Sequence, residues 1–532
     1  MIKYTASLAL LIGASSLFAQ SGKEQKKSNN ALWYQQAFNK KKNFSIRLDK
    51  AYQIANTLNP KEIVVAVIDG GTDPHHPDLQ ANMWHNPREI AFNNVDDDNN
   101  GYTDDTVGWN FIGGKDGKMV GCDNLEIVRL VREQGKTFEG FKADGVTDKA
   151  LLAKYENYLK MKEDVTENRE KYAKQLERML PLVDTIKSML GKMGTENPTA
   201  DQVKAYEPKS MSEMIIIGVL SKNSGMSMGE LYKVLKEQIN QLEVRANCQY
   251  NVDYDPRSMV GDDYNNVGEH LYGNNSVAGP DAFHGTHVAG IIAAVRGNGI
   301  GVEGIASKAK IMVVRVVPDG DERDKDVANG IRYAVDNGAK IINMSFGKGF
   351  SPNKAAVNDA VEYAAKKGVL LVHAAGNSND DNDAIANYPN DSLGYSKRAK
   401  MHMFAETWIE VGASQQQSKH LATDFSNYGQ HNVDLFAPGY QIYSTAPNGG
   451  YENANGTSMA SPVVAGVAAL VWSCYPNLTA VQVKQILMNS VTKHTGKVIL
   501  PGTTDKVKFT ELSVSGGVVN AEKALKLAAT FQ

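Results

Sequence analysis

With 532 residues, 42% of them hydrophobic and 22% charged, the chain has the length for more than one domain and the balance of a soluble globular protein. Its formal net charge of -3 argues against nucleic acid or an anionic membrane surface as the main partner.

Residues 1–19 have the pattern of a secretory signal peptide. Lys3 precedes an apolar stretch from Ala6 to Ile12, and small residues lead to Ala19, after which we expect the cut. No cysteine follows that cut, which argues against a lipid anchor. No other run approaches the roughly 20 apolar residues that a spanning helix needs. We expect an exported protein, periplasmic or secreted, without a membrane span.

The first strong strand comes after an N-terminal extension, residues 20–60, that begins polar and turns helical around residues 48–58. Residues 63–68 are continuously apolar, as in a strand covered on both faces. Asp69 follows directly. A carboxylate at the carboxyl end of a buried parallel strand lies where α/β sheets place their sites, although an aspartate there can also merely begin a turn.

An acidic loop occupies residues 95–105. Oxygen side chains on alternate positions around a glycine can wrap a hard cation, and Asp96, Asp98, Asn100 and Asp104 or Asp105 are so placed. The loop lacks the glutamate that ends an EF-hand loop. We predict a structural calcium site here, with a solvated acidic turn as the alternative.

The amino-acid composition changes at residues 124–247, which are rich in Lys, Glu, Leu and Met. Helical periodicity is long in 149–193 and in 228–244, with a turn-rich break near 194–208, and indicates an inserted helical hairpin or small bundle. The predicted organisation is a signal peptide (1–19), an N-terminal extension (20–60), a discontinuous main domain (61–122 and 248–532) and a helical insertion (123–247).

Three cysteines are present, and two of them, Cys122 and Cys248, stand at the ends of the insertion. Two chain crossings at the base of an insertion lie close together, so we predict a disulfide between them. Cys474 then remains as a buried thiol; three buried thiols are the alternative.

His284 precedes a glycine and a run of Ala, Gly and Ile, which places an imidazole at the start of a tightly packed helix. Together with His287 it could instead hold a metal. No third ligand with suitable spacing is nearby, so we expect His287 to be a hydrogen-bonded core residue.

Regular alternation of strands and helices follows. It predicts a doubly wound, mostly parallel sheet with helices on both faces. Asn377 lies just beyond the strand at 369–375. The expected strands are 310–317, 340–344, 369–375, 409–413, 433–437 and 442–445, and the expected helices are 324–337 and 353–367.

Ser458 lies in a glycine-containing turn that opens an apolar helical segment. Such a serine is positioned as a nucleophile, although a serine there also caps helices. Acyl transfer needs a nucleophile, a base, an orienting carboxylate and an oxyanion donor. Ser458, His284, Asp69 and Asn377 are expected at one edge of the sheet and supply this set.

Four motifs carry a resemblance to subtilisin-family (subtilase) serine endopeptidases. They are Val-Ile-Asp69-Gly-Gly, His284-Gly-Thr-His-Val-Ala-Gly, Ala-Ala-Gly-Asn377 and Gly-Thr-Ser458-Met-Ala-Ser-Pro, in the family's Asp, His, Ser order. The resemblance covers residues 60–115 and 255–525. It implies that Ser458 is the nucleophile, His284 the base, Asp69 its orienting partner and Asn377 an oxyanion donor. It also implies a substrate pocket lined by Ser345, Phe346, Gly347, Ala374, Ala375 and Gly376.

Two departures from the family pattern stand out. The helical insertion separates the aspartate from the histidine, and the segment before the first strand is too short for the folded propeptide that secreted members usually carry. We expect a monomeric endopeptidase that cleaves proteins or peptides through an acyl-enzyme and needs no cofactor for catalysis. A catalytically silent binding protein is the alternative. As a hypothesis, the insertion acts as a cap or lid over the substrate.

Overall fold

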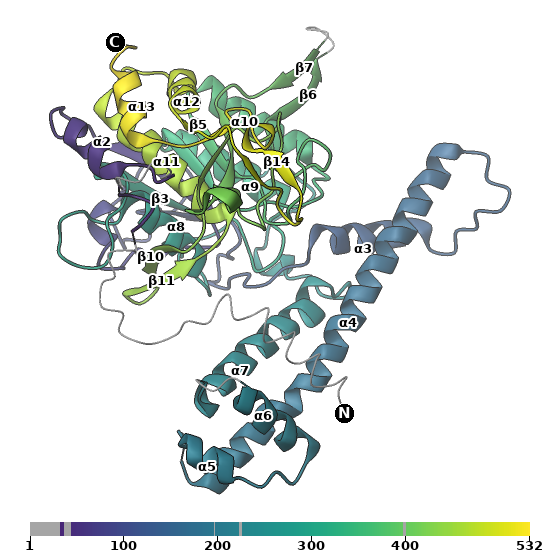
Figure 1. The fold of residues 1–532 in the computed structure, drawn as a ribbon. Coiled ribbons are helices and arrows are strands. Elements are labelled where there is room, and N and C mark those ends of the chain that lie inside the picture. The colour runs from purple at the N-terminus through teal and green to yellow at the C-terminus, as the bar shows by residue number, and fades with distance from the viewer. Residues whose placement is uncertain (1–31, 37–43, 196, 223–225, 397–400, 532) are drawn as a thin grey trace. The chain divides into compact units, whose positions relative to one another are not determined.

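A computed structural model describes residues 32–36, 44–195, 197–222, 226–396 and 401–531 (Figure 1). Most of the described chain belongs to a larger unit formed by Lys27–Gly121 and Pro256–Gln532, and the rest, Cys122–Asp255, forms a separate helical unit. The predicted signal peptide, 1–19, lies outside the described residues.

A nine-stranded sheet organises the larger unit. All its pairings are parallel except the one between the two shortest strands, β12 and β15. The predicted fold class, a mostly parallel α/β sheet, is therefore confirmed. In spatial order the strands are β12 (Thr492–Lys493), β15 (Gly517–Val518), β9 (Leu435–Pro438), β8 (Trp408–Ser414), β5 (Leu370–Ala374), β4 (Ile341–Met344), β1 (Ile63–Asp69), β3 (Ala309–Arg315) and β2 (Gly108–Asn110).

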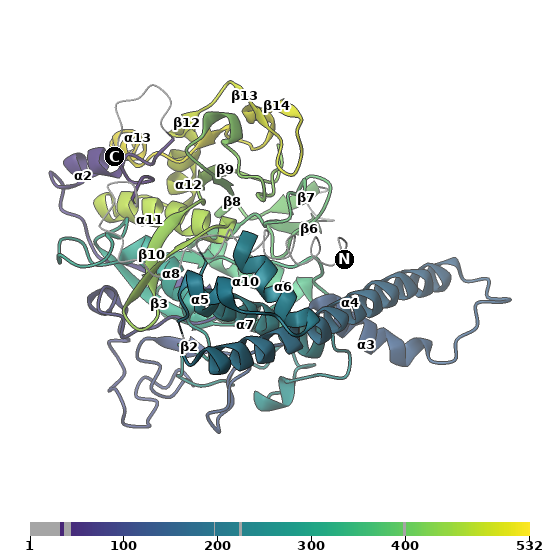
Figure 2. The ribbon, with the colours of Figure 1, turned by 60° about the horizontal axis from the view of Figure 1, so that its bottom comes forward.

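The two faces of the sheet carry separate apolar cores, which explains why β1 is apolar throughout. Successive side chains of a strand point to opposite faces. Val65 and Val67 pack on one side with α8 and α11, both labelled in Figure 2, whereas Ala66 and Ile68 pack on the other with α9 and α10. The helices of this unit are α2 (Leu48–Ala55), α8 (Phe283–Ala293), α9 (Asp324–Asp336), α10 (Lys354–Lys366), α11 (Thr457–Cys474), α12 (Ala480–Asn489) and α13 (Ala521–Ala528).

Helix α11 is the central helix of the first core. Among the described helices it alone is long and apolar enough to cross a membrane, but 94% of that segment is buried inside the protein. Its apolar composition is thus explained by packing on the sheet, since it contacts α8, β8 and β5. This burial fixes the start of the helix, and with it Ser458, against the carboxyl edge of the sheet.

The described part of the N-terminal extension belongs to the larger unit. Trp33, Tyr34, Ile46 and Leu48 are buried in the same core as α11. The Trp33 indole Nε1 donates to the carbonyl of Tyr440 at 3.2 Å. Three two-stranded hairpins complete this unit: β6 (Ser392–Ser396) with β7 (Met401–Phe404), β10 (Ile442–Ala446) with β11 (Gly450–Ala454), and β13 (Lys497–Ile499) with β14 (Lys506–Lys508).

The helical unit contains the two long helices that the sequence predicts, with the same bounds, and three that it does not. α5 lies inside the segment expected to be a turn-rich break, because Thr199 caps it through a capping box with Gln202. The apolar α6 packs with α4 and α7 around a separate core. The helices are α3 (Glu126–Phe138), α4 (Lys149–Met193), α5 (Ala200–Ala205), α6 (Met211–Lys222) and α7 (Met228–Val244), followed by a π-helical turn, Arg245–Gln249.

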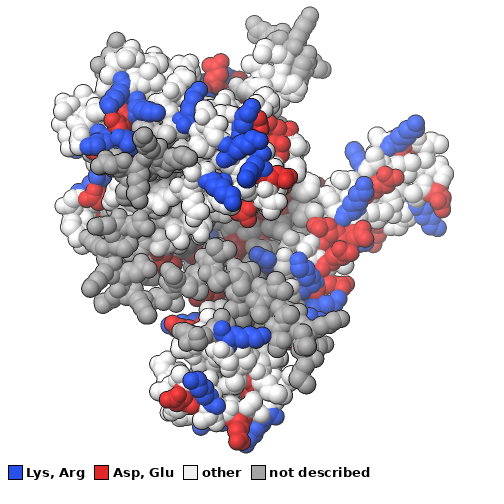
Figure 3. All heavy atoms as spheres, viewed as in Figure 1, with Lys and Arg blue, Asp and Glu red and all other residues white. Residues whose placement is uncertain are grey.

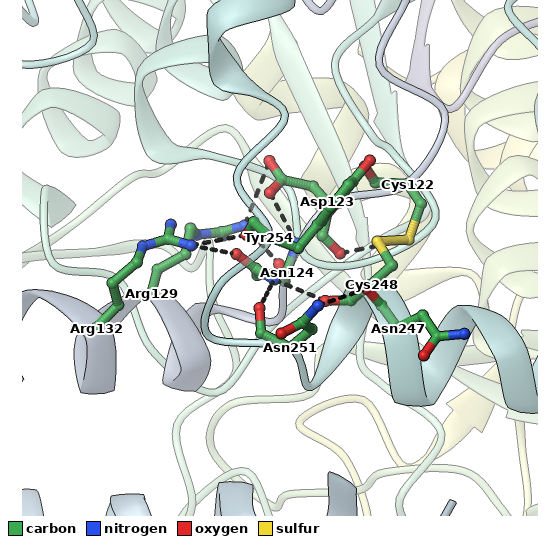
Figure 4. Close-up of a disulfide and its surroundings, with 9 residues drawn as sticks. All are labelled: Cys122, Asp123, Asn124, Arg129, Arg132, Asn247, Cys248, Asn251 and Tyr254. Carbon is green, nitrogen blue, oxygen red and sulfur yellow. Dashed lines mark hydrogen bonds and ion pairs between the residues drawn. A yellow bond between two sulfur atoms is a disulfide. The ribbon is translucent and has the colours of Figure 1, made fainter. Parts of the chain in front are cut away.

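A disulfide joins Cys122 to Cys248 at the two ends of the helical unit, as predicted (Figure 4). Beside it, the Asn124 side-chain amide donates to the carbonyls of Cys248 at 2.7 Å and Asn251 at 3.0 Å. Both chain crossings are thus held together covalently and by hydrogen bonds. Cys474 is a buried free thiol, and burial raises its pKa to about 11.

Removal of this disulfide should destabilise the helical unit. The bond closes a loop with a sequence separation of 126 residues, and cross-links of such loops typically contribute about 2–5 kcal/mol. Reduction, or a Cys122→Ser/Cys248→Ser variant, should lower the urea midpoint of this unit's unfolding, followed by far-UV circular dichroism. A Cys474→Ala variant, which keeps the bond, should remain sensitive to reductant. Identical midpoints with and without reductant would contradict the prediction.

Candidate active site

Asp69 and His284 are in direct contact. Asp69 is the last residue of β1, and His284 is the second residue of α8. His284 Nδ1 lies 2.7 Å from Asp69 Oδ1, which also accepts the backbone N–H of Gly70 at 2.7 Å. Asp69 is buried, whereas the His284 side chain remains 42% exposed. The carboxylate is therefore fixed behind an imidazole that still reaches solvent.

The surroundings of His284 favour the protonated imidazole, so its pKa lies above that of free histidine. Burial lowers the pKa of His284, but the charge and hydrogen bond of Asp69 outweigh it, with a further contribution from Asp281. The net result is a pKa above the ordinary value of 6.5. Asp69 interacts with the ring in its neutral and in its protonated state, so the imidazole can both accept and return a proton while it stays in place.

Ser458 is the second residue of α11, at the carboxyl end of β4. The Ser345 hydroxyl, just beyond β4, donates to the Ser458 carbonyl at 2.9 Å, and the Ser458 hydroxyl donates to the Ser345 carbonyl at 3.1 Å. β4 pairs with β1 up to Met344 and Ile68, so Ser345 and Asp69 are the next residues on two neighbouring strands. The Ser458 hydroxyl thus points to Ser345 rather than to His284. A hydrogen bond between a nucleophile and its base often forms with good geometry only when substrate is bound.

Asn377 is oriented by the start of α11. Its Oδ1 accepts the Thr457 N–H at 2.8 Å and the Thr457 hydroxyl at 3.0 Å. With the carbonyl side so occupied, the Nδ2 donor is free to face the pocket that Asn377 lines. The Ser458 N–H, in the first turn of α11, has no acceptor within the helix. Asn377 and Ser458, which carry these two donors, line the same pocket.

A pocket of about 360 Å³ borders Ser458 and Asn377. Five of the predicted lining residues do line it: Ser345, Phe346, Gly347, Ala374 and Gly376. The prediction is wrong for Ala375, which is fully buried in another apolar cluster with Leu421 and Phe436. Side chains alternate along the chain after β5, so Ala375 points away from the pocket.

His287 is a core residue, as expected. It is fully buried, and its Nε2 lies 3.1 Å from the carbonyl of Glu452. Burial, the largest effect, lowers its pKa to about 4. A neutral, hydrogen-bonded imidazole explains the second histidine of the motif without a metal.

In the acidic loop, the structure gathers a set of carboxylates that differs from the predicted one. Glu89, Asp96 and Asp98 lie with ligand atoms within 4.8 Å of one another. Asp104 is outside this group, and its carboxylate accepts the backbone N–H groups of Asn93 and Asn94.

The remaining members of the predicted set are engaged elsewhere. Asn100 Oδ1 accepts the Tyr102 N–H, and its Nδ2 donates to Asp105. Asp105 is buried against the Tyr333 hydroxyl at 2.6 Å. Glu89 was not predicted, because it precedes the loop in the sequence. Its carboxylate lies close to that of Asp96 only in the folded chain.

Asn387 is a pocket residue that the sequence did not indicate. It lies in the loop between β5 and β6, outside every motif, and no local pattern distinguishes it from the neighbouring asparagines. Its place is fixed by tertiary contacts alone: its Nδ2 lies 3.3 Å from the Ala374 carbonyl and 3.2 Å from the Ala375 carbonyl.

Comparison with known proteins agrees with this geometry. The subtilase family pattern matches residues 60–502. Thermitase of Thermoactinomyces vulgaris is 38% identical over 244 residues, 46% of this chain and 75% of thermitase. Subtilisin BL of Lederbergia lenta is 38% identical over 245 residues, 46% of this chain and 77% of that protein.

A third relative is longer. Subtilisin-like protease 1 of Plasmodium vivax is 33% identical over 301 residues, 54% of this chain but only 45% of that protein. The match to the family pattern spans both segments of the larger unit and contains Asp69, His284, Asn377 and Ser458. The chain belongs to the subtilase family, a family of serine endopeptidases.

Proposed function

We propose that the protein is an exported serine endopeptidase whose triad is Ser458, His284 and Asp69. The observation that supports this most directly is the 2.7 Å contact between His284 Nδ1 and Asp69 Oδ1. It occurs at the strand edge that also holds Ser458. The export expected from residues 1–19 agrees with relatives such as the cell wall-associated protease of Bacillus subtilis.

In the proposed reaction, the Ser458 hydroxyl oxygen attacks the carbonyl carbon of the scissile peptide bond while His284 Nε2 accepts its proton. Asp69 holds the Nδ1–H and stabilises the imidazolium. His284 then protonates the leaving amine, the C–N bond breaks, and an ester to Ser458 remains. Water, deprotonated by His284, attacks this ester, releases the acid and restores Ser458.

Asn377 Nδ2 and the Ser458 N–H are the proposed donors to the oxyanion. The negative charge on the carbonyl oxygen appears only in the tetrahedral intermediate, so donors fixed in advance stabilise the transition state more than the substrate. Asn377 is fixed in this way, because Thr457 occupies its carbonyl oxygen twice. The same helix start therefore positions the nucleophile and both donors.

A fluorophosphonate probe tests the proposal, because it reacts only with an activated serine. The full-length protein should be labelled, and labelling should disappear in Ser458→Ala and in His284→Ala. Ser461→Ala is a matched control, since Ser461 lies one turn further along α11 and its hydroxyl is buried against Asn343. A folded protein that is not labelled would instead indicate a binding protein with the same fold.

A structural calcium ion at Glu89, Asp96 and Asp98 is a second proposal. Three carboxylates this close repel one another, and burial together with the charges of Asp98 and Asp97 raises the pKa of Glu89. A hard cation that prefers carboxylate oxygen ligands would relieve this repulsion. Asp98 already pairs with Arg88 at 3.0 Å, so the ion would compete with that contact.

Calcium should therefore raise the melting temperature of the larger unit, and EDTA should lower it to the value measured without added ions. An Asp96→Ala variant should lose the response, whereas Asp116→Ala, at an exposed aspartate outside the group, should keep it. Equal melting temperatures of the wild type with calcium and with EDTA would refute the site.

The proposed partners are protein or peptide substrates. On the face in Figure 3, acidic and basic side chains lie next to one another rather than in one continuous basic area. This agrees with the small net charge of -3 and gives no electrostatic reason to expect nucleic acid as a partner.

A further inference from the structure

A buried arginine, Arg315, holds the turn that follows Asp69. It is the last residue of β3, where it pairs with Asp69 of β1, and it is 2% exposed. Its Nε donates to the Gly70 carbonyl at 2.7 Å, one terminal nitrogen donates to Asn110 Oδ1 at 3.2 Å, and the other donates to the Val120 carbonyl at 2.6 Å. The donors belong to one rigid plane, so they fix three chain segments relative to one another.

The same guanidinium lies against the segment that leads to His284. A Cβ atom added to Gly279, just before α8, would come within 2.3 Å of Arg315 Nε. The turn at Gly71 also meets this segment directly, because a Cβ atom added to Gly71 would come within 2.1 Å of the Ala278 carbonyl oxygen. Arg315 therefore contacts both this turn and the approach to α8.

Stability alone does not explain this arginine. Its three acceptors are uncharged, and burial lowers its pKa to about 10 with no carboxylate in the described part of the chain to offset that effect. Arg257, which is also buried, instead forms ion pairs at 2.6 Å with both Asp262 and Asp326. A buried cation without an anionic partner is costly, and an apolar side chain of similar volume is often at least as stable. What Arg315 adds is a set of directed hydrogen bonds.

We propose that Arg315 is a positioning residue for catalysis, which keeps Asp69 and His284 in contact although the helical unit separates them in the sequence. The inference rests on the proposed function, because it concerns the contact between His284 Nδ1 and Asp69 Oδ1. That contact requires the turn at Gly70 and the approach to α8 to keep their places, and Arg315 touches both. A misplacement of about 1 Å in a catalytic geometry can cost about 100-fold in rate.

Arg315→Met tests the proposal, because it keeps a long side chain and removes all three donors. Rates on a peptide p-nitroanilide are divided by the number of serines that the fluorophosphonate probe has labelled when its reaction is complete, so that misfolded protein does not count. We expect kcat per labelled site to fall by about 10- to 100-fold, with KM within about 2-fold of the wild-type value. Arg315→Lys keeps the charge but not the planar fork of donors, so it should recover only part of this loss.

Ile311→Ala is the matched control for lost stability. Ile311 is fully buried on the same strand, and its side chain points to the same side of the sheet as that of Arg315. Its truncation should lower the melting temperature and leave kcat per labelled site at the wild-type value. A wild-type kcat per site in Arg315→Met would overturn the proposal, and so would an equal fall in Ile311→Ala.

The test does not depend on the folding of Arg315→Met. If that variant yields no labelled site, Arg315→Lys decides, since a wild-type kcat per site in Arg315→Lys would overturn the proposal. Failure of the proposed function looks different. In that case the wild type itself neither cleaves the substrate nor reacts with the probe, and the inference falls with it.

Discussion

Replacing Ser458 with alanine should reduce kcat by a factor on the order of 10⁶, the effect known for the equivalent serine of the relative subtilisin. The alanine has no nucleophile, so only the oxyanion donors and substrate binding remain to accelerate attack by water. Initial rates on a peptide p-nitroanilide, at enzyme concentrations high enough to detect the residual activity, measure the loss.

Two controls make this result specific. The substitution removes one hydroxyl hydrogen bond, to the Ser345 carbonyl, so the melting temperature should change little. A His284→Ala/Ser458→Ala double variant should be about as inactive as either single variant, because the residues act as a unit. If Ser458→Ala keeps more than a few per cent of wild-type activity, another residue is the nucleophile.

Asp69→Asn should lower kcat by about 10⁴-fold, the magnitude seen when a triad aspartate is replaced in serine proteases. The amide preserves shape but removes the charge that stabilises the imidazolium, and its NH₂ group can hold the ring in the wrong tautomer. The loss should appear in kcat more than in KM, because Asp69 is buried behind His284 and does not line the pocket.

The pH dependence of kcat/KM distinguishes the stabilisation of the His284 imidazolium by Asp69 from a general loss of structure in Asp69→Asn. His284 must be neutral to accept the proton, and Asp69 holds its pKa above 6.5. Wild-type kcat/KM should therefore fall as the pH decreases through this raised pKa. Without the charge of Asp69, burial is the main remaining effect and lowers the pKa, so the acid limb of Asp69→Asn should move to lower pH. An unmoved limb would contradict the assignment.

The sequence was informative where local pattern and packing agree. β1 and α11 are apolar because both are buried, so their continuous apolar runs predict them; Asp69 is found at the end of the first run and Ser458 at the start of the second. The bounds of α4 and α7 follow from long helical periodicity, supported by caps at Asp148 and Ser227.

What the sequence could not predict depends on contacts between distant segments. Asn387 reaches the pocket through carbonyls on another strand, and Glu89 meets Asp96 only once the loop has folded. For Ala375, a one-residue error reversed the direction of the side chain, since neighbouring residues of an extended chain point to opposite sides. α5 was missed because six residues between turns carry too little periodicity to indicate a helix.

The disulfide at the base of the helical unit has a consequence for what happens when the chain is cut by a protease. A cut anywhere between Cys122 and Cys248 divides the polypeptide, yet the fragments stay joined through the sulfur atoms. The aspartate and the histidine, which lie on opposite fragments after such a cut, would still belong to one covalent molecule. Nicked protein would then run as a single band in gel electrophoresis until the disulfide is reduced.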